Sequence, residues 1–401
     1  MTAGVRRKAL FIINSLAGGG AERVMTTLLQ GSAPWRDRFD IALALLDEEE
    51  AAYDPPPWIK TFRLDCGGSL LASLWRTRQL VGRLRPDVTV SFLTRSNAAN
   101  VLATAGRPTR CLISERVNAS AHLNHGLPGL AARILVRMTY PRADHVIAVS
   151  QGVALDLEQN FGVKPDRVSV IANPVDHGRI AEMSAAPSPV PVKGNYIAAA
   201  GRLVPNKNFA MLIDAFARAG LPASLVILGE GPLRGALEEQ IERLGLAGKV
   251  LLPGFIENPF AVLKRASLFA LPSNAEGFPN GMVEAMACGL PVVAANCASG
   301  PSEILLDRAR EDVHGIVHGP AGAVVPQNDP EAFAEALRSV FDALDRESRG
   351  AAALELSQQF SVERTAARYW KTIEGALMTT GSPLRSASAP ASKQRVKEQS
   401  F

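Results

Sequence analysis

Several features that define other classes of protein are missing from this sequence. Its four cysteines, Cys66, Cys111, Cys288 and Cys297, include no Cys-x2-Cys pair. They argue against a disulfide scaffold or a zinc ribbon and favour buried, reduced thiols in a cytoplasmic protein. No apolar run approaches the ~18 residues that cross a membrane. The run at residues 9–13 is short and ends at Asn14, so we interpret it as a first buried strand and not as a signal peptide.

A strong excess of charge of either sign is also missing. The net charge is +4, which is too small to indicate a nucleic-acid partner. The basic residues are unevenly distributed, however, because thirteen lie between Lys60 and Ala143 against only Asp65, Asp87 and Glu115. A locally basic first half suits anionic lipid headgroups or an acceptor that carries a diphosphate. Ordinary solvated charge is the alternative explanation.

Length and periodicity indicate an α/β protein of two domains. The chain has 401 residues, and short apolar runs alternate with helical patterns along it. A proline-rich stretch without periodicity, residues 185–193, reads as the linker between domains 1–184 and 194–360. A further helix is expected at 361–378. The tail, 379–401, is rich in Ser, Pro, Ala and Lys, so we expect it to be disordered.

The first strand leads into a glycine loop and a helix. Gly18, Gly19 and Gly20 are followed by Ala21-Glu22-Arg23, and Arg23 stands where a dinucleotide fingerprint needs its third glycine. A nicotinamide-linked oxidoreductase is therefore a weak alternative. Consecutive glycines let the backbone approach a ligand closely, although a tight strand-to-helix turn would also explain them.

A second block, EGFPNGMVEAMACGLPVV at residues 276–293, carries most of the chemical information. It predicts a glycine-bearing loop, a short helix and a buried strand. Free backbone N–H groups and the dipole at the start of the helix attract phosphate. Two carboxylates, Glu276 and Glu284, flank this turn and are suited to accept hydrogen bonds from hydroxyl groups. The block therefore indicates a site for a phosphorylated sugar or a nucleotide-sugar, while the glutamate pair alone could be one exposed helix face.

This block resembles the Glu-x7-Glu signature of the family-four retaining glycosyltransferases, which have the GT-B fold. Further blocks resemble the family in the same order along the chain: the glycine loop, Gly201-Arg202-Leu203 with Lys207, Gly229-Glu230-Gly231-Pro232 and Leu252-Pro253-Gly254-Phe255. The resemblance implies two doubly wound, Rossmann-like domains that face a cleft, with the last helix returning to the first domain. Asn173-Pro174-Val175-Asp176 departs from the family's usual Asn-Gly-Val-Asp.

The resemblance also implies roles for individual residues. Arg202 and Lys207 would hold the donor diphosphate, Glu284 the ribose and Glu276 the sugar hydroxyls, while a histidine, here assigned to His122, would touch the donor sugar. The implied catalytic residues are Arg202, Lys207, Glu276 and His122. The implied donor-binding residues are Gly18, Gly19, Gly20, Gly201, Arg202, Lys207, Gly229, Ile256, Glu276, Gly277, Phe278, Pro279, Asn280, Gly281 and Glu284. Solvated cations and a surface-loop histidine are the simpler explanations of Arg202, Lys207 and His122.

On the acceptor side we expect Glu22, Arg23, Glu115 and Arg116. Ser-Glu-Arg at residues 114–116 resembles the family members that transfer N-acetylhexosamines to polyprenyl-diphosphate carriers, although a structural ion pair would explain Glu115 and Arg116 equally well. The helix predicted at 127–140 has an apolar stripe that suits a membrane surface or the protein core.

The function that the resemblance implies is retaining transfer from a nucleotide-sugar, UDP-linked, to a glycan or a lipid-linked acceptor in cell-surface polysaccharide or glycoprotein glycan assembly. It implies no metal and a cytoplasmic location with peripheral contact to the inner membrane face. His314 and His318 lie in an expected loop, 307–320, and two histidines without a third ligand do not make a zinc site. A UDP-sugar epimerase and a non-catalytic sugar-nucleotide sensor remain the alternatives.

Overall fold

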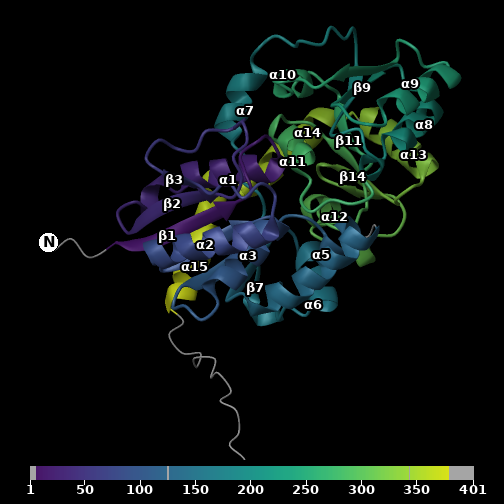
Figure 1. Ribbon diagram of the computed structural model, residues 1–401. Coiled ribbons are helices and arrows are strands. Elements are labelled where there is room, and N and C mark those ends of the chain that lie inside the picture. Colours follow the sequence, from purple (N-terminus) through teal and green to yellow (C-terminus); the bar gives the residue numbers. More distant parts are fainter. Residues whose placement is uncertain (1–5, 124–125, 343, 379–401) are drawn as a thin grey trace, which may run out of the picture.

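The computed structural model describes residues 6–123, 126–342 and 344–378 of this chain. Two α/β bodies, each built on its own sheet, lie against each other (Figure 1). The tail that we expected to be disordered, 379–401, lies outside the described residues. None of the helices in the described part of the chain is long and apolar enough to cross a membrane.

The first sheet has seven parallel strands in the order β3-β2-β1-β4-β5-β6-β7. Helices cover both of its faces, so its central strands read as continuous apolar runs such as ALFII in β1. The strands are β1 Arg7–Ile13, β2 Phe39–Leu45, β3 Lys60–Arg63, β4 Val88–Phe92, β5 Arg110–Glu115, β6 His145–Ala148 and β7 Val168–Val170.

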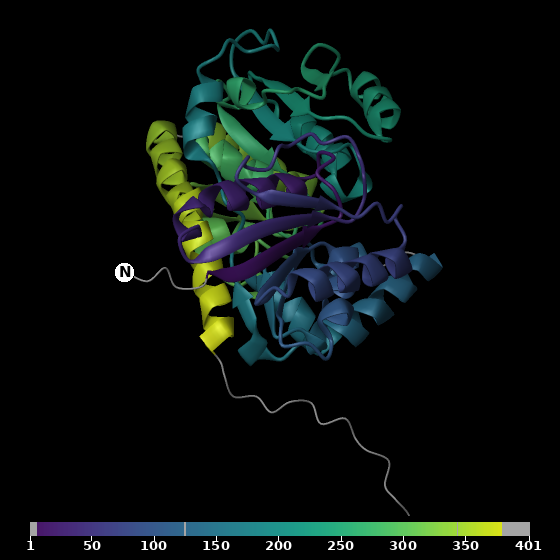
Figure 2. The same cartoon turned by 60° about the vertical axis from the view of Figure 1, so that its left-hand side comes forward.

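The helices of the first body lie in two layers. Helices α2, α3, α5 and α6 pack side by side in that order, whereas α1 packs against the last helix of the chain, α15, in the other layer (Figure 2). Their bounds are α1 Gly20–Gly31, α2 Leu70–Leu84, α3 Thr94–Thr104, α4 Ala119–His122, α5 Gly126–Thr139 and α6 Gln151–Phe161, with 3₁₀ turns η1 Ala33–Trp35, η2 Tyr140–Arg142 and η3 Pro165–Arg167. Helix α7 His177–Ser184 follows in the chain but packs against the second body (Figure 1).

The second sheet has the order β10-β9-β8-β11-β12-β14-β13, with only β13 antiparallel to its neighbour. Its strands are β8 Tyr196–Ala200, β9 Ser224–Leu228, β10 Val250–Gly254, β11 Leu268–Leu271, β12 Val292–Ala295, β13 Val317–Gly319 and β14 Gly322–Val325. The remaining helices are α8 Phe209–Ala219, α9 Arg234–Arg243, α10 Phe260–Leu263, α11 Asn280–Ala287, α12 Pro301–Leu306, α13 Pro330–Phe341, α14 Arg346–Ser357 and α15 Val362–Met378, with 3₁₀ turns η4 Pro205–Lys207, η5 Arg310–Asp312 and η6 Gln358–Phe360.

The predicted fold, including the return of the last helix, is confirmed. On α15, Trp370 is fully buried and donates from its indole Nε1 to the hydroxyl of Ser32, 2.8 Å away, in the first body. Its ring also stacks on Trp35 with a centroid distance of 5.6 Å. Burying an aromatic residue of this size gives the helix a strong hydrophobic attachment to the first domain.

The stretch that we expected to be a plain loop, 307–320, contains η5 and the edge strand β13. Strand β13 has only three residues, with His318 exposed, and therefore gives too weak a pattern for prediction from sequence. Strand β3 was missed for a similar reason, because two of its four residues, Lys60 and Arg63, are charged and none is fully buried.

Strand order reverses between β1 and β4 in the first sheet and between β8 and β11 in the second. In open parallel sheets, ligands bind outside the carboxyl ends of the strands at such switch points. The loops that follow these four strands are therefore where side chains should converge.

Candidate active site

The 276–281 loop and the start of α11 form the first part of the site. Phe278 fixes the loop, because it is buried and packs edge-on against Phe360 at a centroid distance of 5.3 Å. Helix α11 begins without a side-chain cap, and the backbone N–H of Gly281 has no hydrogen-bond acceptor among the described residues. An uncapped helix start of this kind can donate to an anion.

Lys207 and Glu276 form the second part of the site. Lys207 ends η4, which follows β8, and its Nζ lies 2.6 Å from Oε1 of Glu276 at the entrance to the 276–281 loop. Both side chains are only partly covered, at 25% and 10% exposure, so the pair can still meet a ligand. A cation and a carboxylate side by side can bind a phosphate and a hydroxyl of the same molecule.

The backbone that follows β8 and leads into η4 lies very close to the backbone that follows β9. Gly229 follows β9 with φ +138°, and a Cβ at this position would lie 2.0 Å from the carbonyl oxygen of Gly201. Only glycine fits there, which gives a physical reason for the Gly-Glu-Gly-Pro turn. Gly201 and Gly229 therefore shape the site through the backbone.

Glu284 reaches across to the first domain. One turn into α11, its carboxylate forms an ion pair with the guanidinium of Arg23 on α1. Burial raises the pKa of Glu284, and the charges of Arg23 and Arg179 oppose that rise. The pair joins the two motifs that the sequence singled out, the glycine loop and the Glu-x7-Glu block.

The two domains also touch through backbone. A Cβ on Gly277 would lie 2.1 Å from the carbonyl oxygen of Arg116, and a Cβ on Gly20 would lie 3.5 Å from Nδ2 of Asn280. Asn173 bridges the same gap, donating from Nδ2 to Oδ1 of Asn280 at 2.7 Å. The 276–281 loop therefore lies directly against the carboxyl edge of the first sheet.

The other predicted residues lie around this centre with fewer contacts. The Arg202 side chain is exposed, and its guanidinium has no hydrogen-bond or ion-pair partner in the described part of the chain. Ile256 is half-buried against the core, next to Phe255, which is 79% exposed. His122 is exposed at the end of α4, and within the described ranges its ring has no hydrogen-bond partner. The carboxylate of Glu22 folds back over Gly19, and burial raises its pKa.

Glu115 and Arg116, which we expected on the acceptor side, are buried, at 1% and 7% exposure. Glu115 accepts from the hydroxyl of Tyr140 at 2.5 Å, and burial raises its pKa. Arg116 donates to Tyr369 at 2.8 Å and to Asn173. A position at the carboxyl end of a strand does not reveal which way a side chain turns, and these two turn into the first domain.

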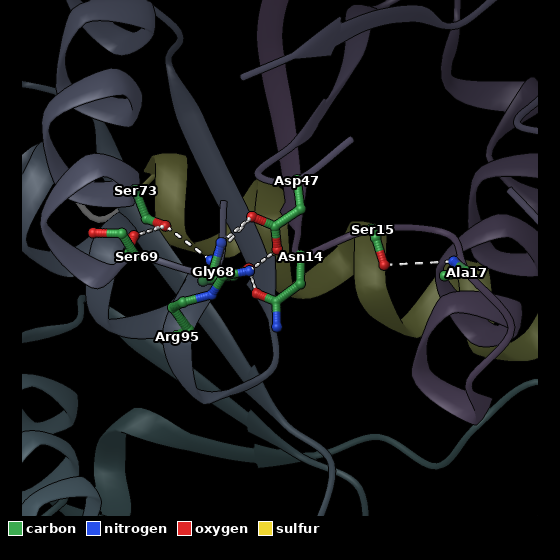
Figure 3. A network of polar contacts seen from close by, with 9 residues as sticks. Asn14, Ser15, Ala17, Asp47, Gly68, Ser69, Ser73 and Arg95 are labelled. Atoms are coloured by element: carbon green, nitrogen blue, oxygen red, sulfur yellow. Dashed lines mark hydrogen bonds and ion pairs between the residues drawn. The ribbon is translucent and has the colours of Figure 1, made fainter. Parts of the chain in front are cut away.

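A polar cluster at the switch point of the first sheet was not predicted. Figure 3 shows Arg95, just after β4, making an ion pair with Asp47, just after β2, and donating to Ser73 at 3.4 Å. Asp47 also accepts from the backbone N–H of Gly68 at 2.9 Å, and Asn14 accepts from Ser96 at 2.7 Å. Asn14, Asp47 and Arg95 each follow a strand closely, and this position was the signal that could have found them.

The described residues contain no group of three or more His, Cys, Asp or Glu side chains that could hold a metal ion. His318 lies on the edge strand β13 and is exposed. Lys207 pairs with Glu276 in the 276–281 loop, and Arg23 pairs with Glu284 on α11.

Two family models match the chain in consecutive blocks. Residues 18–179 match the model described as Glycosyltransferase Family 4, and residues 182–353 match the model described as Glycosyl transferases group 1. A Campylobacter jejuni protein, N-acetylgalactosamine-N,N'-diacetylbacillosaminyl-diphospho-undecaprenol 4-alpha-N-acetylgalactosaminyltransferase, is 33% identical over 75% of this chain and 84% of its own length. This chain belongs to the family-four glycosyltransferases.

Other relatives agree with this assignment. A second Campylobacter jejuni enzyme, GalNAc-alpha-(1->4)-GalNAc-alpha-(1->3)-diNAcBac-PP-undecaprenol alpha-1,4-N-acetyl-D-galactosaminyltransferase, is 28% identical over 75% of this glycosyltransferase and 82% of its own chain. Among solved structures, Anabaena HepE in complex with UDP superimposes with a TM-score of 0.73 at 23% identity, covering 92% of this chain and all of HepE. The Thermosynechococcus elongatus sucrose-phosphate synthase superimposes with a TM-score of 0.77 at 17% identity, covering 92% and 99% of the two chains. These superpositions show the GT-B fold.

Proposed function

We propose that this glycosyltransferase moves an N-acetylhexosamine or hexose from a UDP-sugar to a polyprenyl-diphosphate-linked glycan, with retention of anomeric configuration. The observation that carries the proposal is the meeting of Lys207, Glu276 and the uncapped start of α11 opposite the glycine loop. This arrangement offers a cation, a carboxylate and backbone N–H groups within one small region. These are the groups that a pyrophosphate-linked sugar needs.

In this proposal the donor diphosphate binds between Lys207, Arg202 and the N–H of Gly281. Negative charge develops on the diphosphate as it leaves, so fixed cations and N–H groups stabilise the transition state more than the bound donor. Two protein cations supply this stabilisation without a metal, and Glu276 accepts hydrogen bonds from sugar hydroxyls. Glu284 accepts from the ribose when Arg23 gives up part of its contact with that carboxylate. The acceptor hydroxyl then attacks the anomeric carbon from the face that the diphosphate leaves, so the new glycosidic bond forms as the bond from that carbon to the diphosphate oxygen breaks. The departing diphosphate takes the hydroxyl proton, and no protein nucleophile is required.

Different observations support the proposed nucleotide and the proposed acceptor. Solved neighbours with the same fold bind UDP. The two Campylobacter relatives are named for transfer of N-acetylgalactosamine to glycans on diphospho-undecaprenol. The acceptor lies on the first-domain side, where the glycine loop and Arg23 face the 276–281 loop.

A lipid-linked acceptor requires contact with a membrane, and α5 offers a surface for it. Leu127, Leu130, Ile134 and Met138 are between 51% and 82% exposed along one side of this helix. Arg133 and Arg137 lie on the same helix. On α2, in the same layer of helices, Leu71 and Trp75 are also exposed. An apolar stripe with neighbouring arginines is suited to the surface of an anionic bilayer.

Donor screening and product analysis test the proposal. We expect UDP-N-acetylhexosamines to raise the thermal unfolding midpoint and to be consumed with a polyprenyl-diphosphate-linked saccharide, also in the presence of a chelator. NMR of the product should show an axial linkage from an α-linked donor. Interconversion of UDP-sugars without acceptor would instead indicate an epimerase. Binding with no donor hydrolysis and no transfer would indicate a sensor.

Vesicle flotation tests the membrane contact. Binding to vesicles that contain anionic phospholipid should fall in the double variant Leu130→Glu/Ile134→Glu. The matched control is Leu354→Glu, at a position that is 40% exposed on α14 of the second domain. Equal flotation of both variants would contradict the assignment of α5.

A further inference from the structure

The 307–320 segment lies close to the active site, although it was expected to be a plain loop. Its 3₁₀ turn, η5, begins at Arg310, whose Nε donates to the carbonyl of Asn296 at 3.2 Å. Asn296 directly follows β12 and donates in return to the carbonyl oxygens of Arg310, at 3.0 Å, and Val313, at 3.2 Å. These reciprocal hydrogen bonds fasten the segment to the carboxyl edge of the second sheet.

From this attachment, hydrogen bonds run to the loops that carry Lys207 and Glu276. Arg310 donates from Nη2 to Oε1 of Gln327 at 3.1 Å, and Gln327 donates from Nε2 to the carbonyl of Asn274 at 2.6 Å. Asn274 lies two residues before Glu276. Its backbone N–H donates to the carbonyl of Asn206 at 2.8 Å, next to Lys207.

A second hydrogen bond closes the same connection. Asn206 donates from Nδ2 to the carbonyl of Ala275 at 2.8 Å, so the two loops are joined on both sides of Asn274. We call this series of hydrogen bonds, from Asn296 and Arg310 through Gln327 and Asn274 to Asn206, the ladder. The ion pair of Lys207 and Glu276 lies at its end. The ladder therefore fixes the backbone from which both side chains of the pair project.

The charges of Arg310, Lys207 and Glu276 also act on one buried group. Burial raises the pKa of the Cys297 thiol to about 12; Glu276 adds to that rise, and Lys207 and Arg310 oppose it. Cys297 is fully buried directly after Asn296. The thiol that all three charges influence therefore lies directly beside Asn296, the residue to which Arg310 is hydrogen-bonded.

We propose that Arg310 and Gln327 are positioning residues for the transfer reaction. Through them, the 307–320 segment holds the two loops that carry Lys207 and Glu276 in a fixed position relative to each other. This inference rests on the proposed function of the pair. Hydrogen-bonded partners behind catalytic groups commonly change activity by about 10–100-fold when they are removed, because the groups in front lose their fixed orientation.

The chain offers a matched control for the first test. Arg310→Met removes the guanidinium but keeps an unbranched side chain. Arg308→Met makes the same change in the same segment, at an exposed side chain without a hydrogen-bond or ion-pair partner among the residues that the structure describes. We expect kcat for transfer to fall about tenfold in Arg310→Met and Gln327→Leu, with a smaller change in KM for the donor. Arg308→Met should behave like the wild type.

Hydrogen exchange provides a readout that does not depend on activity. In Arg310→Met and Gln327→Leu, but not in Arg308→Met, peptides covering 204–208 and 272–278 should exchange faster, because the N–H of Asn274 is part of the ladder. If the wild-type enzyme transferred no sugar, the proposed function would fail while exchange still tested the ladder. Unchanged kcat despite faster exchange would overturn the positioning role, as would identical behaviour of Arg310→Met and Arg308→Met.

A double variant tests whether the two residues act in series. If they do, Arg310→Met/Gln327→Leu should lose no more kcat than the worse single variant. If the fold-losses of kcat in the two single variants multiply in the double variant, the two residues act independently, which would contradict their action in series. Arg310→Lys, which keeps the charge but replaces the planar guanidinium fork with a single ammonium, should recover only part of the loss.

Discussion

Charged side chains lie at the carboxyl edges of both sheets, but they are paired differently at the two edges. At the first edge, Asp47 is held by Arg95 and by the N–H of Gly68, and Arg116 is enclosed by Tyr369 and Asn173. At the second edge, Lys207 pairs with Glu276 and stays partly exposed, and the guanidinium of Arg202 has no hydrogen-bond or ion-pair partner among the described residues. Each edge therefore pairs a cation with a carboxylate, but the second edge also presents an exposed cation that no described residue pairs.

This difference supports the donor site that we propose at the second edge. Arg202 can bind a diphosphate without giving up a protein partner, and the partly exposed Lys207 can contact it beside Glu276. From the first domain, Arg23 reaches the same region through its ion pair with Glu284.

The largest expected effect concerns the second edge. Lys207→Ala should lower turnover by about 10²-fold or more, the scale of removing a preorganised charge stabiliser. The measurement is kcat for transfer from the UDP-sugar. Lys249→Ala, at an exposed position on the same domain, is the control and should keep normal turnover. Near-normal turnover in Lys207→Ala would refute the role of this side chain.

The contact between the two edges is tested by a pair of glycines. Gly277→Ala places a methyl group against the carbonyl oxygen of Arg116, where a Cβ would lie at only 2.1 Å, so the loop or the domain must shift at a cost of about 1–3 kcal/mol. Gly235→Ala, on α9 of the same domain, is the control, because a Cβ there meets nothing within 4 Å. Turnover should fall about tenfold or more in Gly277→Ala and remain near normal in Gly235→Ala. Equal activities would show that the edges need not touch.

At the first edge we expect a loss of stability without a loss of donor binding. Arg95→Met leaves Asp47, whose side chain is 12% exposed, without its counter-ion and should lower the free energy of unfolding by about 2 kcal/mol. Denaturant unfolding measures this change, and calorimetric titration with UDP should give wild-type affinity. Asp47→Leu/Arg95→Met should recover part of the stability. A large loss of UDP affinity in Arg95→Met would show that the donor binds at the first edge and would contradict the proposed donor site.

The smallest expected effect is a dependence of stability on pH at Glu284. Because its folded-state pKa is raised from an ordinary value of 4.5, the native state binds its proton more tightly than the unfolded state. Wild-type stability should therefore fall, relative to Glu284→Gln, as pH rises from about 4.5 through the raised pKa. Unfolding of both proteins across this range checks the sign. A wild type that gains stability relative to Glu284→Gln over this range would show that Arg23 outweighs burial.

Residues close together in the sequence were easier to predict than contacts between distant ones. The glycine loop and the Glu-x7-Glu block were identified from local patterns, and the order of strands and helices led to the fold. The ion pair of Arg23 with Glu284 joins positions 261 residues apart, so only the packing of the two domains reveals it. The burial of Glu115 and Arg116 could not be predicted, because it depends on neighbours such as Tyr140 and Tyr369, which lie far away in the sequence.

Calorimetric titration of UDP into the wild type, Lys207→Ala and Arg95→Met tests the central claim most directly. We expect UDP affinity to fall about tenfold or more in Lys207→Ala, where a charged donor is lost, and to be unchanged in Arg95→Met. Undiminished affinity in Lys207→Ala, together with a loss in Arg95→Met, would contradict this claim.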